Sequence, residues 1–239
     1  MDEIIHNIKT IKKIKKENAK LKKIAPYNFC DRWCERCDKT QKCKVYQDDF
    51  NTRLKHISDG KDPDDCNVAL EDVKASFEKS LEVLKKWAEE KDIDISKIDN
   101  EQNKDEENKK RQSFQCPFYE LTLKYAEEVS EFVKEAFYEN QETAPDLVND
   151  YEALIWYHTL LPATAHRLLS DVYAEESEDE FRLYDAIAQI EIIKKSIVQS
   201  EEALRNILIE KITDRYKISE ILDILQDIAK QVETIEEKI

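Results

Sequence analysis

The sequence predicts an all-α protein: a bundle of about six to eight helices with a short cysteine-rich metal-binding module near the N-terminus. Only one glycine, Gly60, occurs in 239 residues. Hairpin sheets, phosphate-binding loops and dinucleotide-binding turns all need residues that adopt positive φ, so these architectures are disfavoured. The charged fraction of 38 %, with abundant Lys, Glu, Ile and Leu, is typical of long amphipathic helices. Four of the six cysteines are clustered in one short stretch.

Residues 2–24 are predicted to form the first helix, because isoleucine and leucine recur every three or four positions between lysines. Asn18 falls on the same apolar stripe, and we expect it to be partly exposed; the alternative is a buried asparagine that fixes helix register, as in coiled coils. Residues 1–44 carry thirteen Lys and Arg against six Asp and Glu, in an acidic protein of net charge −15. We expect this basic segment to lie on the acidic remainder, and recruitment of an acidic partner or nucleic acid is the alternative.

The cysteine stretch that follows has the spacing Cys30-x3-Cys34-x2-Cys37-x5-Cys43. Thiolates are soft anionic ligands, and four of them complete a zinc shell or the corners of an iron–sulfur cluster. We therefore predict that these four residues bind one metal centre. With the first helix they make up an N-terminal region, residues 1–58.

Residues 59–91 are predicted to form a helix that packs on this region. Asp62 is the expected N-cap and Pro63 the expected first helical residue. Cys66 is interpreted as a small core residue rather than a ligand. The expected apolar face continues through Leu70, Val73, Phe77, Leu81, Leu84 and Ala88.

Residues 92–113 are almost wholly polar and are predicted to be a linker or an exposed loop. The C-terminal bundle is then expected over residues 114–239. Pro117 is predicted to open a helix over residues 117–139, and a second helix is predicted from Pro145, which Pro162 bends or splits. A third helix is predicted to start from a capping box at Ser177 and to run to about 212. The last predicted helix covers about 217–237.

The metal can be an iron–sulfur cluster or zinc, or the thiols can carry no metal. Structural zinc sites commonly combine two closely spaced ligand pairs with glycine in the turns, whereas this chain has one CxxC pair and no glycine nearby. Iron–sulfur clusters accept uneven spacings. We therefore favour the cluster over zinc. The spacing of Cys30, Cys34 and Cys37 matches the CxxxCxxC motif of radical SAM enzymes, but the helical periodicity after it does not fit that family's barrel.

A second constellation is His158 and His166, on either side of Pro162. Facing helices of a bundle can build a metal or substrate pocket from imidazoles and carboxylates. The alternative is that these histidines are ordinary residues satisfied by hydrogen bonds. Further polar candidates near the same stripe are Asp185, Gln189, Ser196, Gln199, Glu128 and Glu131.

Three functions stay open from the sequence. The first is metal binding, with an iron–sulfur cluster used for electron transfer, sensing or structure. The second is an interaction scaffold in which zinc staples the first helix to the bundle, and the third is an oxidoreductase with a pocket near His158 and His166. No signature of a Ser or Cys nucleophile occurs, so whether the chain is an enzyme stays open.

The expected location is the cytoplasm, because no signal peptide or membrane-spanning run occurs in the sequence. A reducing compartment also favours metal binding over disulfides for clustered cysteines. The net charge disfavours nucleic acid as a partner, except through the basic N-terminal helix. A protein partner and an oligomer both stay open.

Overall fold

The computed structural model describes residues 13–14, 16–20, 26–93, 116–139, 145–172, 180–210 and 215–238. Within these residues the secondary structure is helical and contains no strand, which confirms the all-α prediction. The chain divides into two compact units. The first unit joins Met1–Trp33 with Asn108–Ile239, and the second is Cys34–Glu107. No helix in the described ranges is both long enough and apolar enough to cross a membrane.

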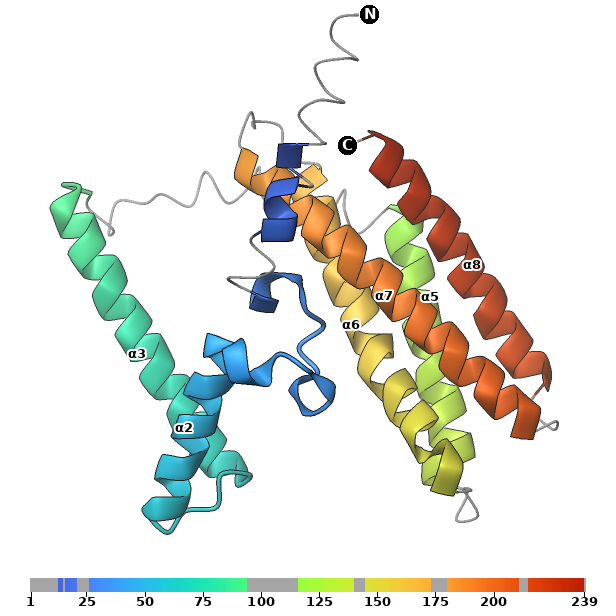
Figure 1. Ribbon diagram of the computed structural model, residues 1–239, viewed down its shortest axis with the longest axis horizontal. Coiled ribbons are helices and arrows are strands. Elements are labelled where there is room, and N and C mark those ends of the chain that lie inside the picture. The colour runs from blue at the N-terminus through green and yellow to red at the C-terminus, as the bar shows by residue number, and fades with distance from the viewer. Residues whose placement is uncertain are drawn as a thin grey trace, which may run out of the picture. The chain divides into compact units, whose positions relative to one another are not determined.

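The first unit is a four-helix bundle (Figure 1). Each helix packs against two neighbours, since α6 contacts α5 and α7 while α8 contacts the other sides of α5 and α7. A π-helical turn, Lys134–Tyr138, extends α5, and a 3₁₀ turn, Pro145–Leu147, precedes α6. The four helices are α5 (Pro117–Val133), α6 (Val148–Val172), α7 (Glu180–Glu210) and α8 (Arg215–Lys238).

Alternating three- and four-residue spacings build the bundle core. On α8 the fully buried side chains are Ile218, Ile221, Leu225, Ile228 and Val232. Such a spacing keeps one seam of the helix facing its partners, as in coiled coils. Two buried hydroxyls lie on α7, Ser196 and Ser200, and Ser200 accepts a 2.7 Å hydrogen bond from the Tyr125 hydroxyl of α5. Burial raises the pKa of the Tyr125 phenol, so this hydroxyl stays protonated and can donate.

Two prolines show how far sequence rules hold in this bundle. Pro117 opens α5 as predicted, with Cys116 in an extended conformation before it. Pro162 was expected to bend or split its helix, and it does not split it, because α6 continues through it from Val148 to Val172. Leu161, Pro162 and Ala165 are all buried, so core packing holds this part of α6 together.

The described part of the N-terminal segment packs on the helical bundle within the first unit. Residues 16–20 are helical, and Ile14 and Asn18 are buried. The Tyr184 hydroxyl of α7 donates a hydrogen bond to the Glu17 carboxylate. The prediction that Asn18 is partly exposed was therefore wrong, because this segment buries it at 2 % exposure.

The second unit contains two longer helices, α2 (Lys44–Ser58) and α3 (Cys66–Glu90). Gly60 adopts φ 74° in the turn between them, as its place in the sequence suggests. Asp62 does not cap α3. Its carboxylate accepts a 2.9 Å hydrogen bond from the N–H of Asp64 in the turn, and Asp65 caps the helix by accepting from Asn67 at 2.7 Å. The helix therefore begins three residues later than predicted.

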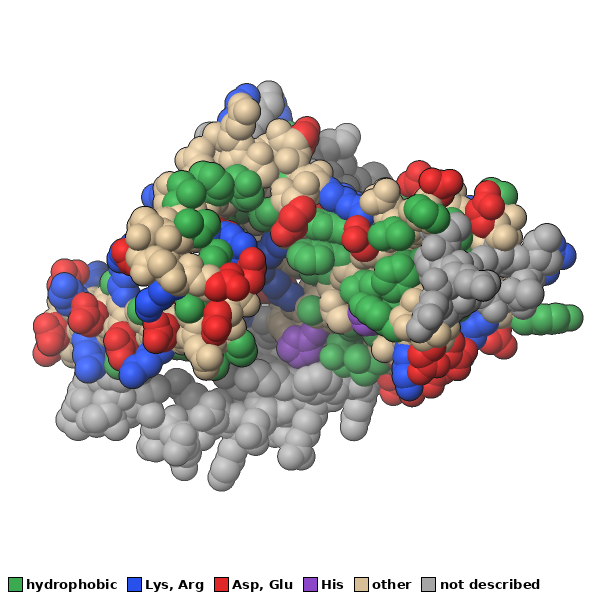
Figure 2. All heavy atoms as spheres, turned by 90° about the horizontal axis from the view of Figure 1, so that it is seen from below, with side chains coloured by type: hydrophobic (Ala, Val, Ile, Leu, Met, Phe, Trp, Pro, Cys, Tyr) green, Lys and Arg blue, Asp and Glu red, His purple; other side chains and the backbone are tan. Residues whose placement is uncertain are grey.

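The apolar face of α3 is largely exposed, unlike the core of the first unit. Of the residues predicted to be buried, Ala88 is buried, but Phe77 is 73 % exposed and Cys66 is exposed as well. The interpretation of Cys66 as a core residue was therefore wrong. Figure 2 shows hydrophobic side chains at the surface among charged ones. The exposed apolar residues of α3 are Leu70, Val73, Phe77, Leu81, Val83, Leu84 and Trp87.

Candidate functional site

The boundary along the chain between the two units falls within the cysteine stretch. Cys30 belongs to the first unit, and Cys34, Cys37 and Cys43 belong to the second. All six cysteines of the chain lie in the described ranges, and none forms a disulfide. Cys30 follows a 3₁₀ turn, Pro26–Phe29, and its thiol donates a 3.5 Å hydrogen bond to the carbonyl of Tyr27.

The three cysteines of the second unit lie in tight turns before α2. The N–H of Cys37 bonds the carbonyl of Cys34 at 3.1 Å, which closes the CxxC turn. The N–H of Lys39 then donates to the Cys37 sulfur at 3.4 Å. This N–H···S bond forms without glycine in the turn. Cys43 is buried, and its N–H donates to Thr40 at 3.2 Å.

No metal-binding group of three or more His, Cys, Asp or Glu side chains is found among the described residues. The four-cysteine centre therefore stays a prediction. The other two cysteines lie elsewhere, with Cys66 at the start of α3 and Cys116 at the cap of α5.

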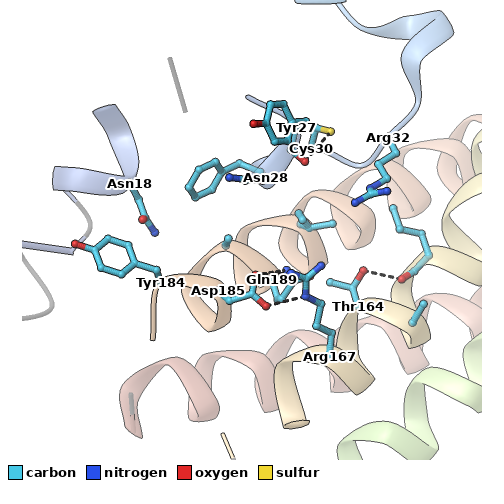
Figure 3. A pocket seen from close by; sticks show the side chains of 15 residues that line it. Asn18, Tyr27, Asn28, Cys30, Arg32, Thr164, Arg167, Tyr184, Asp185 and Gln189 are labelled. Atoms are coloured by element: carbon cyan, nitrogen blue, oxygen red, sulfur yellow. Dashed lines mark hydrogen bonds and ion pairs between the residues drawn. The ribbon is translucent and has the colours of Figure 1, made fainter. Parts of the chain in front are cut away.

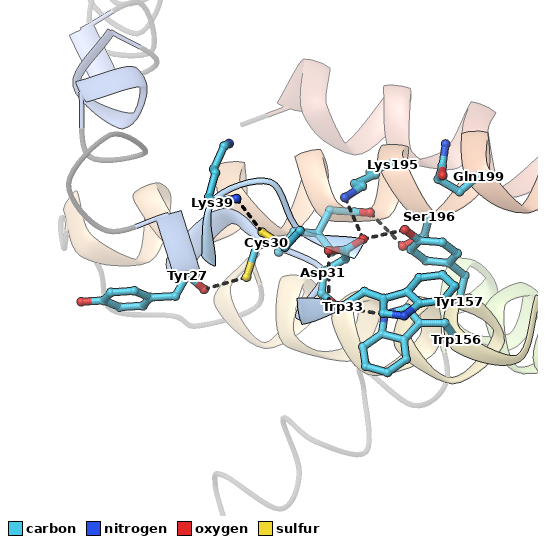
Figure 4. Close-up of polar contacts among 12 residues, drawn as sticks. Tyr27, Cys30, Asp31, Trp33, Lys39, Trp156, Tyr157, Lys195, Ser196 and Gln199 are labelled. Atoms are coloured by element: carbon cyan, nitrogen blue, oxygen red, sulfur yellow. Dashed lines mark hydrogen bonds and ion pairs between the residues drawn. The ribbon is translucent and has the colours of Figure 1, made fainter. Parts of the chain in front are cut away.

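Asp31, between Cys30 and Arg32, anchors the cysteine-bearing segment to the bundle (Figure 4). Its carboxylate accepts a 2.5 Å hydrogen bond from the Tyr157 hydroxyl and lies 2.7 Å from the Lys195 ammonium group. Its backbone carbonyl accepts a 2.9 Å hydrogen bond from the Trp156 indole. Only 6 % of Asp31 is exposed, so this is a buried charge with its partners supplied by α6 and α7.

The partners of Asp31 keep it ionised. Burial alone would raise the pKa of Asp31, but the hydrogen bonds from Lys195 and Tyr157 outweigh burial and lower the pKa below its ordinary value of 3.8. Two residues on, the Trp33 ring stacks on Trp156 with ring centres 5.3 Å apart. The segment is therefore held by charge, hydrogen bonds and aromatic packing together.

A cavity of about 580 Å³ lies beside this anchor, within the first unit (Figure 3). The N-terminal segment forms one wall, and α6 and α7 form the other. Leu160, Ala163, Ala188 and Ile192 supply apolar surface. Its volume is within the range of about 300–1,000 Å³ that is usual for small-molecule sites. The polar and aromatic lining residues are Asn18, Tyr27, Asn28, Phe29, Cys30, Arg32, Thr164, Arg167, Tyr184, Asp185 and Gln189.

One end of the cavity holds a buried amide with unmet hydrogen-bonding capacity. Neither the oxygen nor the nitrogen of the Asn18 side chain has a hydrogen-bond partner, although the residue is 2 % exposed. A buried polar group without a partner costs about 1–3 kcal/mol. Such a group in a cavity wall is poised to bond a ligand.

Arg32 lies toward the other end of the cavity, opposite Asn18 (Figure 3). Its backbone adopts φ 59°, a region that residues other than glycine rarely occupy. The Arg32 guanidinium makes no ion pair with any residue in the described ranges. It is therefore available to an anionic group in the cavity.

The cavity wall formed by α6 and α7 contains a hydrogen-bonded polar cluster. Arg167 grips the Asp185 carboxylate with two bonds of 2.7 and 2.8 Å, and the Gln189 amide nitrogen donates to the same carboxylate at 3.2 Å. Asp171 is a neighbour of Asp185. Burial, with the neighbouring Asp185 carboxylate, raises the pKa of Asp171 to about 7.

The two predicted histidines do not form a joint site. They are eight residues apart on the continuous helix α6, which corresponds to about 12 Å along its axis. His158 bonds the carbonyl of Ile155 at 2.7 Å through Nδ1, and the His166 ring packs edge-on against Tyr119 at 5.8 Å. Neither residue lines the cavity.

The remaining polar candidates divide between the cavity and ordinary structural contacts. Asp185 and Gln189 line the cavity. Ser196 is buried and donates to the carbonyl of Ile192. Gln199 donates to Glu202 at 3.4 Å. Glu128 and Glu131 both pair with Lys217 of α8.

Sequence reasoning missed Asp31 as the anchor and Asn18 as a cavity residue. The partners of Asp31 lie between about 125 and 164 residues away along the chain, so no local pattern marks them. The place of Asn18 on an apolar stripe was the available signal. No protein family, curated protein or solved structure matches this chain.

Proposed function

We propose that the chain is a metal-binding helical protein in which Cys30, Cys34, Cys37 and Cys43 hold one centre, an iron–sulfur cluster used for electron transfer, sensing or structure. The observation that carries this proposal is the hydrogen bond from the Lys39 N–H to the Cys37 sulfur. Backbone N–H groups aimed at sulfur stabilise the negative charge of a metal-bound thiolate and tune cluster potentials.

The other contacts of the segment agree with this proposal. None of its cysteines is consumed in a disulfide. Asp31 fixes the backbone immediately after Cys30 against α6 and α7. Metal binding commonly assembles its own ligands as it folds the site, so the thiols need not be gathered before the metal arrives.

The test is metal analysis and absorbance of the anaerobically purified full chain. We expect a brown protein that contains iron and sulfide, whose broad visible absorbance is bleached by dithionite. Cys34→Ser should remove most of the iron. Cys66→Ser is the matched control, because this exposed cysteine on α3 lies outside the cluster of four. Unchanged iron content in Cys34→Ser would contradict the four-cysteine centre.

The second candidate is a helical interaction scaffold in which zinc replaces the cluster. The observation that favours it is the exposed apolar face of α3, which a protein partner could cover. A colourless protein with stoichiometric zinc, lost in Cys34→Ser and kept in Cys66→Ser, would select this candidate over the cluster.

The third function, an oxidoreductase with a pocket near His158 and His166, gains no support from these contacts. The two rings have separate surroundings, and neither lines the cavity, although Leu160, Ala163 and Thr164 between them on α6 do.

A further inference from the structure

We propose that the cavity between the N-terminal segment and α6–α7 binds a mononucleotide, with its base at Asn18 and its phosphate at Arg32. The inference does not rest on the proposed metal centre. Cys30 belongs to both proposals, but Cys34→Ser, which tests the metal centre, changes no residue that lines the cavity.

The Asn18 end has the chemistry of a base-recognition site. A side-chain amide offers one acceptor and a two-hydrogen donor side by side, which matches the adjacent donor and acceptor atoms on the edge of a nucleobase. Both halves of the Asn18 amide lack a partner within the protein. A ligand that supplied both bonds would relieve the cost of burying this group.

Two neighbouring features extend the same recognition. Gln189 uses its amide nitrogen on Asp185, which leaves its carbonyl oxygen as an acceptor for a ligand N–H. The rings of Tyr27 and Tyr184 also line the cavity. Aromatic rings of this kind favour flat, heteroaromatic ligands.

The Arg32 end has the chemistry of an anion site. Its guanidinium is without an ion-pair partner among the described residues, whereas Arg167 in the opposite wall is engaged with Asp185 through two bonds. Guanidinium groups bind phosphate through two parallel hydrogen bonds. Because Figure 3 places Asn18 and Arg32 at opposite ends, the ligand must carry its planar and its anionic part at separate ends, as a mononucleotide does.

The test is calorimetric titration of the full chain with the four common ribonucleoside 5′-monophosphates, the matching nucleosides and ribose 5-phosphate. We expect at least one monophosphate to bind. Its nucleoside should bind about tenfold or more weakly, because it lacks the charge-assisted bonds to Arg32. Failure of all four monophosphates at millimolar concentration, or equal affinity of nucleoside and monophosphate, would overturn the proposal.

Two variants separate ligand contacts from structural roles. Asn18→Leu should weaken binding about tenfold or more, while the ligand-free variant melts at the same or a higher temperature, because a buried amide without partners has been replaced by an apolar group. A lower melting temperature would mean that Asn18 is structural and would count against the proposal.

Arg32→Ala should weaken the monophosphate and leave the affinity of the nucleoside unchanged. Its control is Arg205→Ala, an exposed arginine on α7 that does not line the cavity. If both cavity variants bound like the unmodified protein, the nucleotide would occupy a different place and the assignment would be wrong.

Discussion

The two units use the same helical periodicity with opposite results. In the first unit, apolar stripes from four helices meet, and side chains such as Leu154 and Ile193 have no exposed surface. In the second unit, α3 carries a comparable stripe, yet Leu81 is 49 % exposed. A stripe therefore predicts a helix and its apolar face, whereas burial of that face depends on a neighbour that local sequence does not reveal.

The largest expected effect distinguishes these two stripes directly. Leu154→Ala should lower the free energy of unfolding by about 2–5 kcal/mol, since it opens a cavity in a packed core. Leu81→Ala, the same change on an exposed face, should alter it by no more than about 0.5 kcal/mol. Urea unfolding of both variants provides the measurement. Equal losses would show that α3 is covered in solution.

The next largest effect on stability is expected at Asp31, the buried anchor of the first unit. Asp31→Asn should cost about 1.5–3 kcal/mol at neutral pH, because the buried carboxylate charge that pairs with Lys195 and accepts the Tyr157 hydrogen bond is lost. Since the pKa of folded Asp31 lies below 3.8, its contribution is present above that pH and disappears as the pH falls further. Asp227→Asn, at an exposed pair with Lys230, should cost far less at any pH.

Asp171, the neighbour of Asp185, should give the reverse pH dependence of folding stability. Folding raises the pKa of Asp171 to about 7, so the folded protein holds a proton that the unfolded chain releases near pH 4. Stability contributed by this group is complete below pH 4 and is lost as the pH rises toward 7. Asp171→Asn should therefore gain stability relative to the unmodified protein across that range. Thermal melts at a series of pH values would contradict this if the difference stayed constant.

The smallest expected effect concerns the link between α2 and α3. The His56 ring lies 2.9 Å from the Asp72 carboxylate, and the Asp72 side chain is 44 % exposed. Asp72→Ala should cost less than about 1 kcal/mol, as is usual for partly exposed pairs. Its effect should appear as faster amide hydrogen exchange in α2, with the bundle unaffected. Glu71→Ala, which removes the exposed pair with Lys61, is the control.

The helices were predictable from the sequence because their signals are local. Pro117 opens α5, and the spacing of isoleucine and leucine marks α8 throughout. The N-cap of α3 was misplaced by three residues because Asp62 and Asp65 are chemically equivalent candidates, and only the turn geometry selects between them.

The candidate sites were predictable only where chemistry is concentrated in one stretch. The close spacing of four cysteines predicts a shared role, and their binding of a metal stays a proposal. The cavity instead combines Asn18, Arg32 and Gln189, which lie up to about 170 residues apart along the chain. No pattern in the sequence marks such a set, because helix packing alone brings it together.

Through Asp31, the proposed metal site and the proposed ligand site both depend on one lysine, Lys195. Cys30 and Arg32 flank Asp31 directly, and its grip on the bundle runs through Lys195. A change at Lys195 would remove the charged partner of Asp31 and so loosen the backbone anchor between Cys30 and Arg32. Under the two proposals, metal binding at Cys30 and ligand binding at Arg32 would then weaken together from one substitution on α7.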